Sequence, residues 1–187
     1  MKIDTNKRYI LIAVSALLVL AVAVIVIVTA GANRSVQLSA EIGMATPESL
    51  YRDAAAIVIA EPTGQRSWFT GGGVRFRQVS VRVVGTLRGE PAPEETLRIL
   101  QTVGLEADPG LKKGTRYLLF LDPYAVGSVQ GMDKAAGAYV VKGAFKGAYP
   151  LDARGNPAAI RTSYETEEQT AQREEAMRAI WDQVSRG

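Results

Sequence analysis

Five arginines and no acidic residue lie between Pro62 and Gly89. The basic residues are Arg66, Arg75, Arg77, Arg82 and Arg88, and Trp68 and Phe69 lie among them. Guanidinium groups form paired hydrogen bonds to carboxylate or phosphate oxygens, and they stack on aromatic rings. The stretch therefore predicts a binding surface for an anionic polymer or a partner protein. A basic face that meets only solvent would contain the same residues, and this alternative stays open.

Trp68 and Phe69 lie in the middle of residues 64–73, which end in three glycines and are expected to form a loop. We interpret the aromatic pair as a plug over the core, with an exposed recognition tip or a membrane-surface contact as alternatives. The glycines lack the Gly-Lys-Ser/Thr sequence and the helix start of a phosphate-binding loop. A flexible hairpin or loop arm is expected instead.

Few residue types remain for catalysis, because the chain contains no histidine and no cysteine. This absence removes the usual zinc and copper ligands, and with them Cys–His and Ser–His–Asp catalysis. Nucleophilic catalysis by a Ser–Lys pair, or acid–base catalysis by a carboxylate pair, is the remaining enzymatic alternative. Its candidates are Ser67, Ser80, Ser128, Lys134, Lys142, Lys146, Asp122 and Asp152. No Ser-x-x-Lys motif frames them, so we predict no catalytic residues and no cofactor.

Residues 152–156 show a faint similarity to a calcium-binding loop. Arg154 occupies a position where a ligand oxygen is needed, and the distal glutamate is missing. No metal site is predicted.

One apolar segment, residues 9–30, predicts a transmembrane signal anchor. Its 22 residues contain no charge, proline or glycine, and a helix of this length is roughly 33 Å long, enough to cross a hydrocarbon core. Basic residues dominate positions 1–8, which predicts a cytoplasmic N-terminus and an extracytoplasmic C-terminal domain. The alternative is a secreted protein cleaved near Ala32, but the apolar run is longer than a signal peptide requires.

Residues 31–45 are expected to form a linker, and 46–187 a single domain. Thr46 and Pro47 predict the start of a short helix that ends near Asp53. Apolar runs and alternating residues predict strands at 56–60, 74–84, 96–101, 115–121, 139–141 and 144–149, and residues 158–160 are expected to pair back.

Within residues 74–84 the apolar positions change phase near Gln78. This change predicts a bulge, which would bring Arg75, Arg77 and Arg82 to one outward side.

Residues from about 163 to 185 predict a C-terminal amphipathic helix. Its apolar stripe, expected to pack on the domain or else to bind a partner, is Met177, Ile180, Trp181 and Val184. The charged side chains Arg173, Glu174, Glu175 and Arg178 are expected to face water.

The whole pattern predicts a mainly β domain with flanking helices, a small antiparallel barrel followed by a helix. It resembles the OB-type barrels of the netrin and tissue-inhibitor kind and uncharacterised bacterial proteins of that outline. Ala54–Glu61 resembles their first strand, Val79–Glu90 the second strand with its turn, and Gly114–Leu121 the fourth. The resemblance covers about residues 46–160. The animal members are held by disulfides and inhibit proteases through an N-terminal cysteine, and this chain has no cysteine. The resemblance therefore implies a fold and not an inhibitory activity.

These features predict a non-enzymatic binding module, tethered to the bilayer through residues 9–30 and facing the outside of a bacterial cell. Its expected partner is an unknown protein or an anionic polymer, and the chain is expected to be a monomer or a weak oligomer. The expected compartment argues against nucleic acid. The alternatives are an accessory subunit of a membrane complex and a Ser–Lys or carboxylate hydrolase.

Overall fold

The computed structural model describes residues 45–103, 110–125, 130–161 and 165–185. The predicted membrane segment lies outside these residues. In the described part of the chain, no helix has the length and apolar character needed to cross a bilayer. Residues from Ala45 onward form one compact unit.

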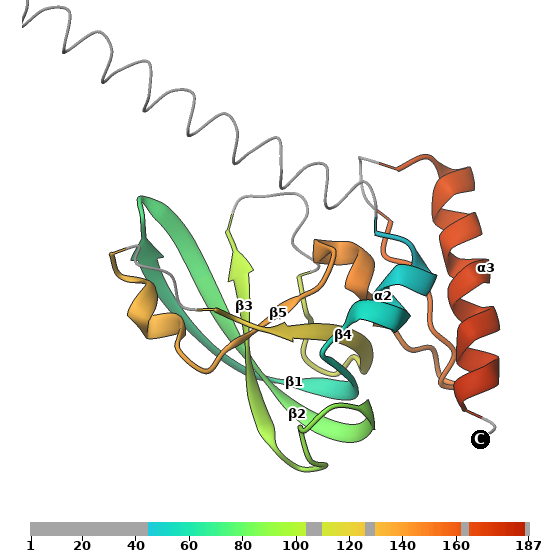
Figure 1. Ribbon diagram of the computed structural model, residues 1–187, viewed down its shortest axis with the longest axis horizontal. Helices are drawn as coiled ribbons and strands as arrows, with labels where there is room; N and C mark the ends of the chain where they lie inside the picture. The colour runs from blue at the N-terminus through green and yellow to red at the C-terminus, as the bar shows by residue number, and fades with distance from the viewer. Residues whose placement is uncertain (1–44, 104–109, 126–129, 162–164, 186–187) are drawn as a thin grey trace, which may run out of the picture. The chain divides into compact units, whose positions relative to one another are not determined.

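Within the described residues, six strands form one mixed sheet: β1 (Ala56–Gly71), β2 (Val74–Arg88), β3 (Thr96–Thr102), β4 (Tyr117–Pro123), β5 (Tyr139–Val141) and β6 (Ala148–Pro150) (Figure 1). The helical elements are α2 (Pro47–Asp53), α3 (Glu167–Val184) and the 3-10 turns η1 (Met132–Ala135) and η2 (Ala144–Gly147). The helix predicted to begin at Thr46 and the C-terminal helix are both present.

Five of the strands close into a ring. Their order is β1-β2-β3-β5-β4, and β1 pairs with β4 to complete the circle. All the ring pairings are antiparallel except that of β3 with β5. β6 pairs with β4 beside β5. The predicted mainly β architecture with a C-terminal helix is confirmed. The expectation of an antiparallel barrel is wrong in one respect, because β3 and β5 pair in parallel.

Alternate residues of every ring strand fill the interior, as the period of two requires. Val58, Val81, Ile99 and Leu119 are each at most 1 % exposed and belong to one apolar cluster. A ring of this size has room only for side chains, so its interior is a packed core.

A second core lies outside the ring, where α2 and α3 cover β1 and β4 (Figure 1). Ile57 and Phe120 point outward from the strands and meet Leu50 of α2 and Met177 of α3, all of them buried. Trp181 packs at the edge of this cluster, so the stripe predicted on the C-terminal helix does pack on the domain.

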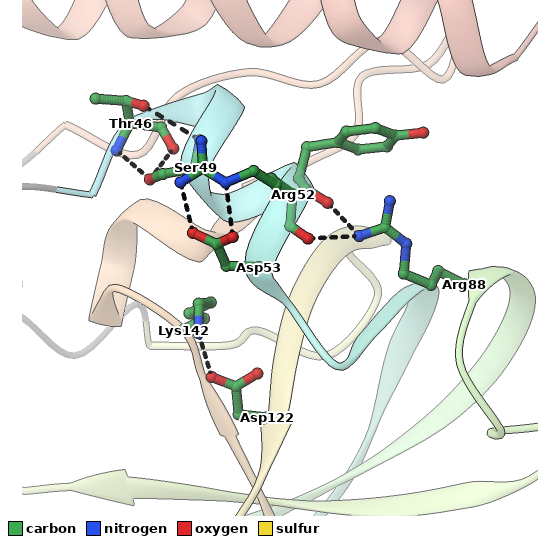
Figure 2. Close-up of polar contacts among 8 residues, drawn as sticks. Thr46, Ser49, Arg52, Asp53, Arg88, Asp122 and Lys142 are labelled. Atoms are coloured by element: carbon green, nitrogen blue, oxygen red, sulfur yellow. Dashed lines mark hydrogen bonds and ion pairs between the residues drawn. The ribbon is translucent and has the colours of Figure 1, made fainter.

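Helix α2 owes its short, well-defined form to its ends. Thr46 and Ser49 form a capping box in which the Ser49 amide donates to Thr46 Oγ1 (3.2 Å) and the Thr46 amide donates to Ser49 Oγ (2.9 Å) (Figure 2). Pro47 occupies the first turn, where its missing N–H costs nothing.

A third, smaller core lies under the far end of the β1–β2 hairpin, which Figure 1 shows on the opposite side of the domain from α2 and α3. There η1 contributes Met132 and Ala135, and the hairpin contributes Phe69, with Phe76 packed alongside. The two phenylalanine rings are stacked with centroids 5.4 Å apart.

Residues 64–73 form the expected hairpin rather than a loop arm. β1 runs on to Gly71, and the turn consists of Gly72 and Gly73 with φ of 55° and 78°. Two consecutive left-handed residues make the tight turn whose twist suits a β-hairpin, and glycine adopts that conformation without strain. Residues 144–147 are not a strand but the η2 turn, and the bridge expected near residues 158–160 joins Leu151 to Pro157.

The bulge predicted near Gln78 is wrong. β2 pairs with β3 in unbroken register from Phe76 to Arg82, and the register of the β1–β2 pair shifts at three places, between Ile57 and Val58, between Ile59 and Ala60, and between Pro62 and Arg66. The apolar phase changes because opposite faces of β2 are covered at its two ends. Val79 and Val81 face the ring interior, whereas Phe76 faces the third core on the other side.

Candidate functional site

One face of the β1–β2 hairpin collects three of the five predicted arginines. Arg77 lies directly opposite Trp68 in the ladder, Arg75 opposite Thr70, and Arg66 opposite Val79. Residues that face each other across an antiparallel pair share a side of the sheet, and so do residues two apart along a strand. We call Arg66, Trp68, Arg75 and Arg77 the basic–aromatic face. Val79 lies on the same side of the hairpin and belongs to the ring interior. The basic–aromatic face is therefore a continuation of the inner face of the ring beyond the end of the ring.

Two arginines of the neighbouring strand β2 stack on the ring of Trp68. The guanidinium carbons of Arg75 and Arg77 are 4.9 and 5.7 Å from the centroid of its ring. These are cation–π distances, and Trp is the most favourable aromatic partner. The side chain is still 48 % exposed, so the stacked arginines leave much of the indole open to solvent.

Arg77 is also held from the other side by β3. Its Nε and Nη2 atoms donate to Gln101 Oε1 over 3.0 and 2.8 Å. Gln101 is only 5 % exposed, and its Nε2 donor has no hydrogen-bond partner. Trp68, Arg77 and Gln101 thus form a row of side chains across three strands. Together these side chains contain more hydrogen-bond donors than acceptors, which suits an anionic ligand.

Phe69 does not share the basic–aromatic face. It points to the opposite side of the hairpin and is buried in the third core. Phe69 therefore acts as the predicted plug, whereas Trp68 is exposed, so the two aromatic residues do not act as the predicted pair.

A polar contact fixes the same hairpin to η1. Gln78 is buried, accepts from Ser67 Oγ (3.3 Å) and donates through Nε2 to the carbonyl of Lys134 (2.9 Å). The basic–aromatic face is thereby built on a strand pair that is anchored from behind.

Arg82 lies on the other side of β2, contrary to the expectation that it shares a face with Arg75 and Arg77. Because no bulge interrupts the pairing with β3, the odd and even positions keep opposite sides. Arg82 forms ion pairs with Glu94 (3.1 Å) and Glu61 (3.6 Å). Its charge is offset locally, and Glu61 and Glu94 both lie just outside the stretch that contains no acidic residue.

Arg88 stabilises α2. Its Nη1 donates to the carbonyls of Tyr51 and Arg52 near the helix C-terminus, and its guanidinium carbon lies 4.7 Å from the Tyr51 ring centroid (Figure 2). The last carbonyls of a helix lack intrahelical donors, and a cation there also suits the helix dipole. Arg88 therefore caps the C-terminus of α2 and is not part of the basic–aromatic face.

Two of the candidate bases for a Ser–Lys pair, Lys142 and Lys146, lie against carboxylates. Lys142 Nζ is 2.6 Å from Asp122 Oδ2 (Figure 2). Asp122 Oδ1 accepts from the Ala55 amide. Lys146 Nζ lies 3.7 Å from Glu165. Ser128 lies outside the described residues.

In the turn that resembles a calcium-binding loop, the Asp152 carboxylate accepts hydrogen bonds from backbone amides of the turn itself. Asp152 Oδ1 accepts from the amides of Arg154 and Asn156, both over 2.8 Å. The Asn156 amide, followed by that of Arg154, holds the pKa of the Asp152 carboxyl below its usual value. Across the described residues, no group of three acidic side chains is placed to hold a metal ion.

Arg173 was expected to face water and is instead buried. Its Nη2 donates to the carbonyl of Ile160 and to Glu165 Oε2, both over 2.8 Å, and its guanidinium carbon lies 5.5 and 5.6 Å from the rings of Phe145 and Tyr149. The signal was in the sequence, because Arg173 precedes Met177 by four residues and so falls on the apolar stripe.

Comparison with family models, with curated proteins and with solved structures finds no match for this chain.

Proposed function

We propose that the chain is a non-enzymatic binding module, tethered by residues 9–30 and facing outside the cytoplasm, whose basic–aromatic face receives an anionic partner. We further propose that its barrel is of the OB type and related to the netrin kind. The five-stranded ring with one parallel pair supports that assignment.

The observation that carries the proposal is the half-exposed Trp68 beside Arg75 and Arg77. Restricted side chains lose less entropy on binding, so an indole held by two guanidinium groups is preorganised to meet a ligand. The guanidinium groups supply charge and paired donors, and the indole supplies stacking area. Arg82 and Arg88 are left out of the proposed surface, since one is paired with glutamates and the other caps α2.

A photoreactive amino acid at Thr70 tests the proposal in cells that produce the full chain. Thr70 is exposed and lies on the basic–aromatic face opposite Arg75. The matched control position is Arg178, which is exposed on α3. Illumination should join the chain to one recurring partner from position 70 and not from position 178. Equal, diffuse labelling from both positions would contradict a dedicated binding face.

A further inference from the structure

The β1–β2 hairpin carries both of the large apolar side chains that are exposed in the described part of the chain. Trp68 is 48 % exposed and Val74 is 42 % exposed. Between them lie Gly71, Gly72 and Gly73, so the tip of the hairpin has backbone and no side chains. A methyl group added at Gly73 would meet nothing within 4 Å, whereas one at Gly71 would overlap Met132, and the Gly72 amide donates to the carbonyl of Gln130. The tip is therefore open on the Gly73 side and packed against residues 130–132 on the β1 side.

Trp68 and Val74 point to opposite sides of the hairpin. Val74 pairs with Gly71, and Trp68 lies three positions before Gly71, so the alternation places the two side chains on different faces. A rigid partner docked on one face would leave the other side chain in water. A soft, planar interface entered by the tip would cover both.

The basic side chains lie close to the tip of the hairpin, where they would meet lipid headgroups if the tip entered the interface. Arg75 follows Val74 directly, and Arg66 and Arg77 lie further from the tip on the same face as Trp68. Tryptophan concentrates at the level of lipid headgroups, and clustered arginines are attracted to anionic lipid surfaces. Their guanidinium groups match the phosphate oxygens of the headgroups.

We infer that the hairpin tip, residues 66–77, docks on the anionic lipid headgroups of the bilayer that holds the anchor. This inference rests on the proposed function and names its anionic partner. Trp68 and Val74 enter the interface from the two sides of the tip, and Arg66, Arg75 and Arg77 contact phosphates.

The test uses the full chain reconstituted in vesicles of phosphatidylcholine, with or without phosphatidylglycerol. The chain has two tryptophans, so Trp181→Phe leaves Trp68 as the only indole reporter. In vesicles with phosphatidylglycerol, its emission should shift to shorter wavelength and be quenched by phospholipids brominated on the acyl chain. Both changes should disappear in about 0.5 M salt, where charges are screened within a few ångströms.

Two variants and one control accompany this measurement. Arg75→Glu with Arg77→Glu should abolish the response, and Val74→Asp should reduce the quenching, with circular dichroism confirming that each variant is folded. The control chain Trp68→Phe reports from Trp181, which should not respond to lipid charge.

Emission from Trp68 that is identical in the two vesicle types would overturn the lipid assignment. If position 70 then still crosslinks to one protein or polymer in cells, the proposed function survives with a different partner. If neither response occurs, both fail.

Discussion

The Nη2 atom of Arg173 lies 2.8 Å from Glu165 Oε2, and both side chains are more than nine-tenths buried. Lys146 Nζ lies 3.7 Å from the same carboxylate. The pair joins α3 to the segment that precedes it, behind the rings of Phe145 and Tyr149. The position of the C-terminal helix therefore depends on a buried charge as well as on Met177.

Arg173→Met should lower the free energy of unfolding by about 3–5 kcal/mol, because it leaves Glu165 buried without its main partner. Adding Glu165→Leu should recover much of that loss, since the double variant removes both members of the pair. The control is Arg178→Met, which breaks a more exposed pair with Glu174 and should cost about 1 kcal/mol or less. Urea unfolding of the folded domain measures all three. Equal losses for Arg173→Met and Arg178→Met would contradict the buried arrangement.

Tyr149 should make stability depend on alkaline pH. Burial, opposed by the nearby Arg173, raises the pKa of the Tyr149 hydroxyl from 10.0 to about 12. Above pH 10 the unfolded chain loses this proton while the folded chain keeps it. The stability that the group contributes is therefore complete below pH 10 and is lost as the pH rises to about 12, by roughly 2–3 kcal/mol.

Tyr149→Phe isolates this effect. The hydroxyl lies beside Arg173 without a hydrogen bond of normal geometry, so at neutral pH the substitution should change stability by less than about 1 kcal/mol. Urea unfolding at a series of alkaline pH values should show that the wild-type chain loses more stability than the variant. Parallel pH profiles would show that Tyr149 is not buried as described.

Gly147 lies where the chain cannot accommodate a side chain. A Cβ there would overlap the carbonyl oxygen of Lys142 and lie 3.1 Å from a methyl group of Val141. Gly147→Ala should cost about 3 kcal/mol or more, since the colliding atoms are backbone. Gly155→Ala is the control: its φ is 82° and nothing lies within 4 Å, so only the backbone strain of about 1 kcal/mol applies. Thermal unfolding compares the two, and the reverse order of stabilities would refute the packing around η2.

The strands were predictable from sequence because most of them are covered on a constant side. β4 is apolar at every position from Tyr117 to Leu121, and its burial on both faces follows from that pattern. The prediction for β2 was wrong because the covered side of this strand changes along its length. The alternation within a single strand shows which residues are apolar, but it does not show which part of the fold covers them. When the covered face changes along a strand, the sequence pattern is therefore the same as that of a bulge.

The candidate site was only partly predictable for the same reason. The run of arginines was visible, but the glutamates that pair with Arg82 come from β1 and from the turn before β3. Arg88 caps a helix that precedes it by more than 30 residues. Such partners are set by the closure of the ring, which a linear pattern does not contain.

The proposed tether predicts the topology of the full chain. Protease added to cells stripped of their outer layers should digest the domain from Ala45 onward, because an anchor with a basic N-terminal flank keeps that flank in the cytoplasm. The intact mass of the membrane-extracted chain should include residues 9–30. Full protection from protease would reverse the orientation, and a mature N-terminus near Ala32 would replace the anchor by a cleaved signal.

The central claim is that the anionic partner binds the basic–aromatic face through its charges. The most direct measurement is the crosslinking yield from position 70 in cells, compared between Arg75→Glu/Arg77→Glu and the single reversal Arg82→Glu on the opposite side of β2. The double reversal should reduce the yield at least tenfold, since two attractive contacts become repulsive, and Arg82→Glu should leave it nearly unchanged. A yield that survives the double reversal, or that falls equally with Arg82→Glu, would contradict the account.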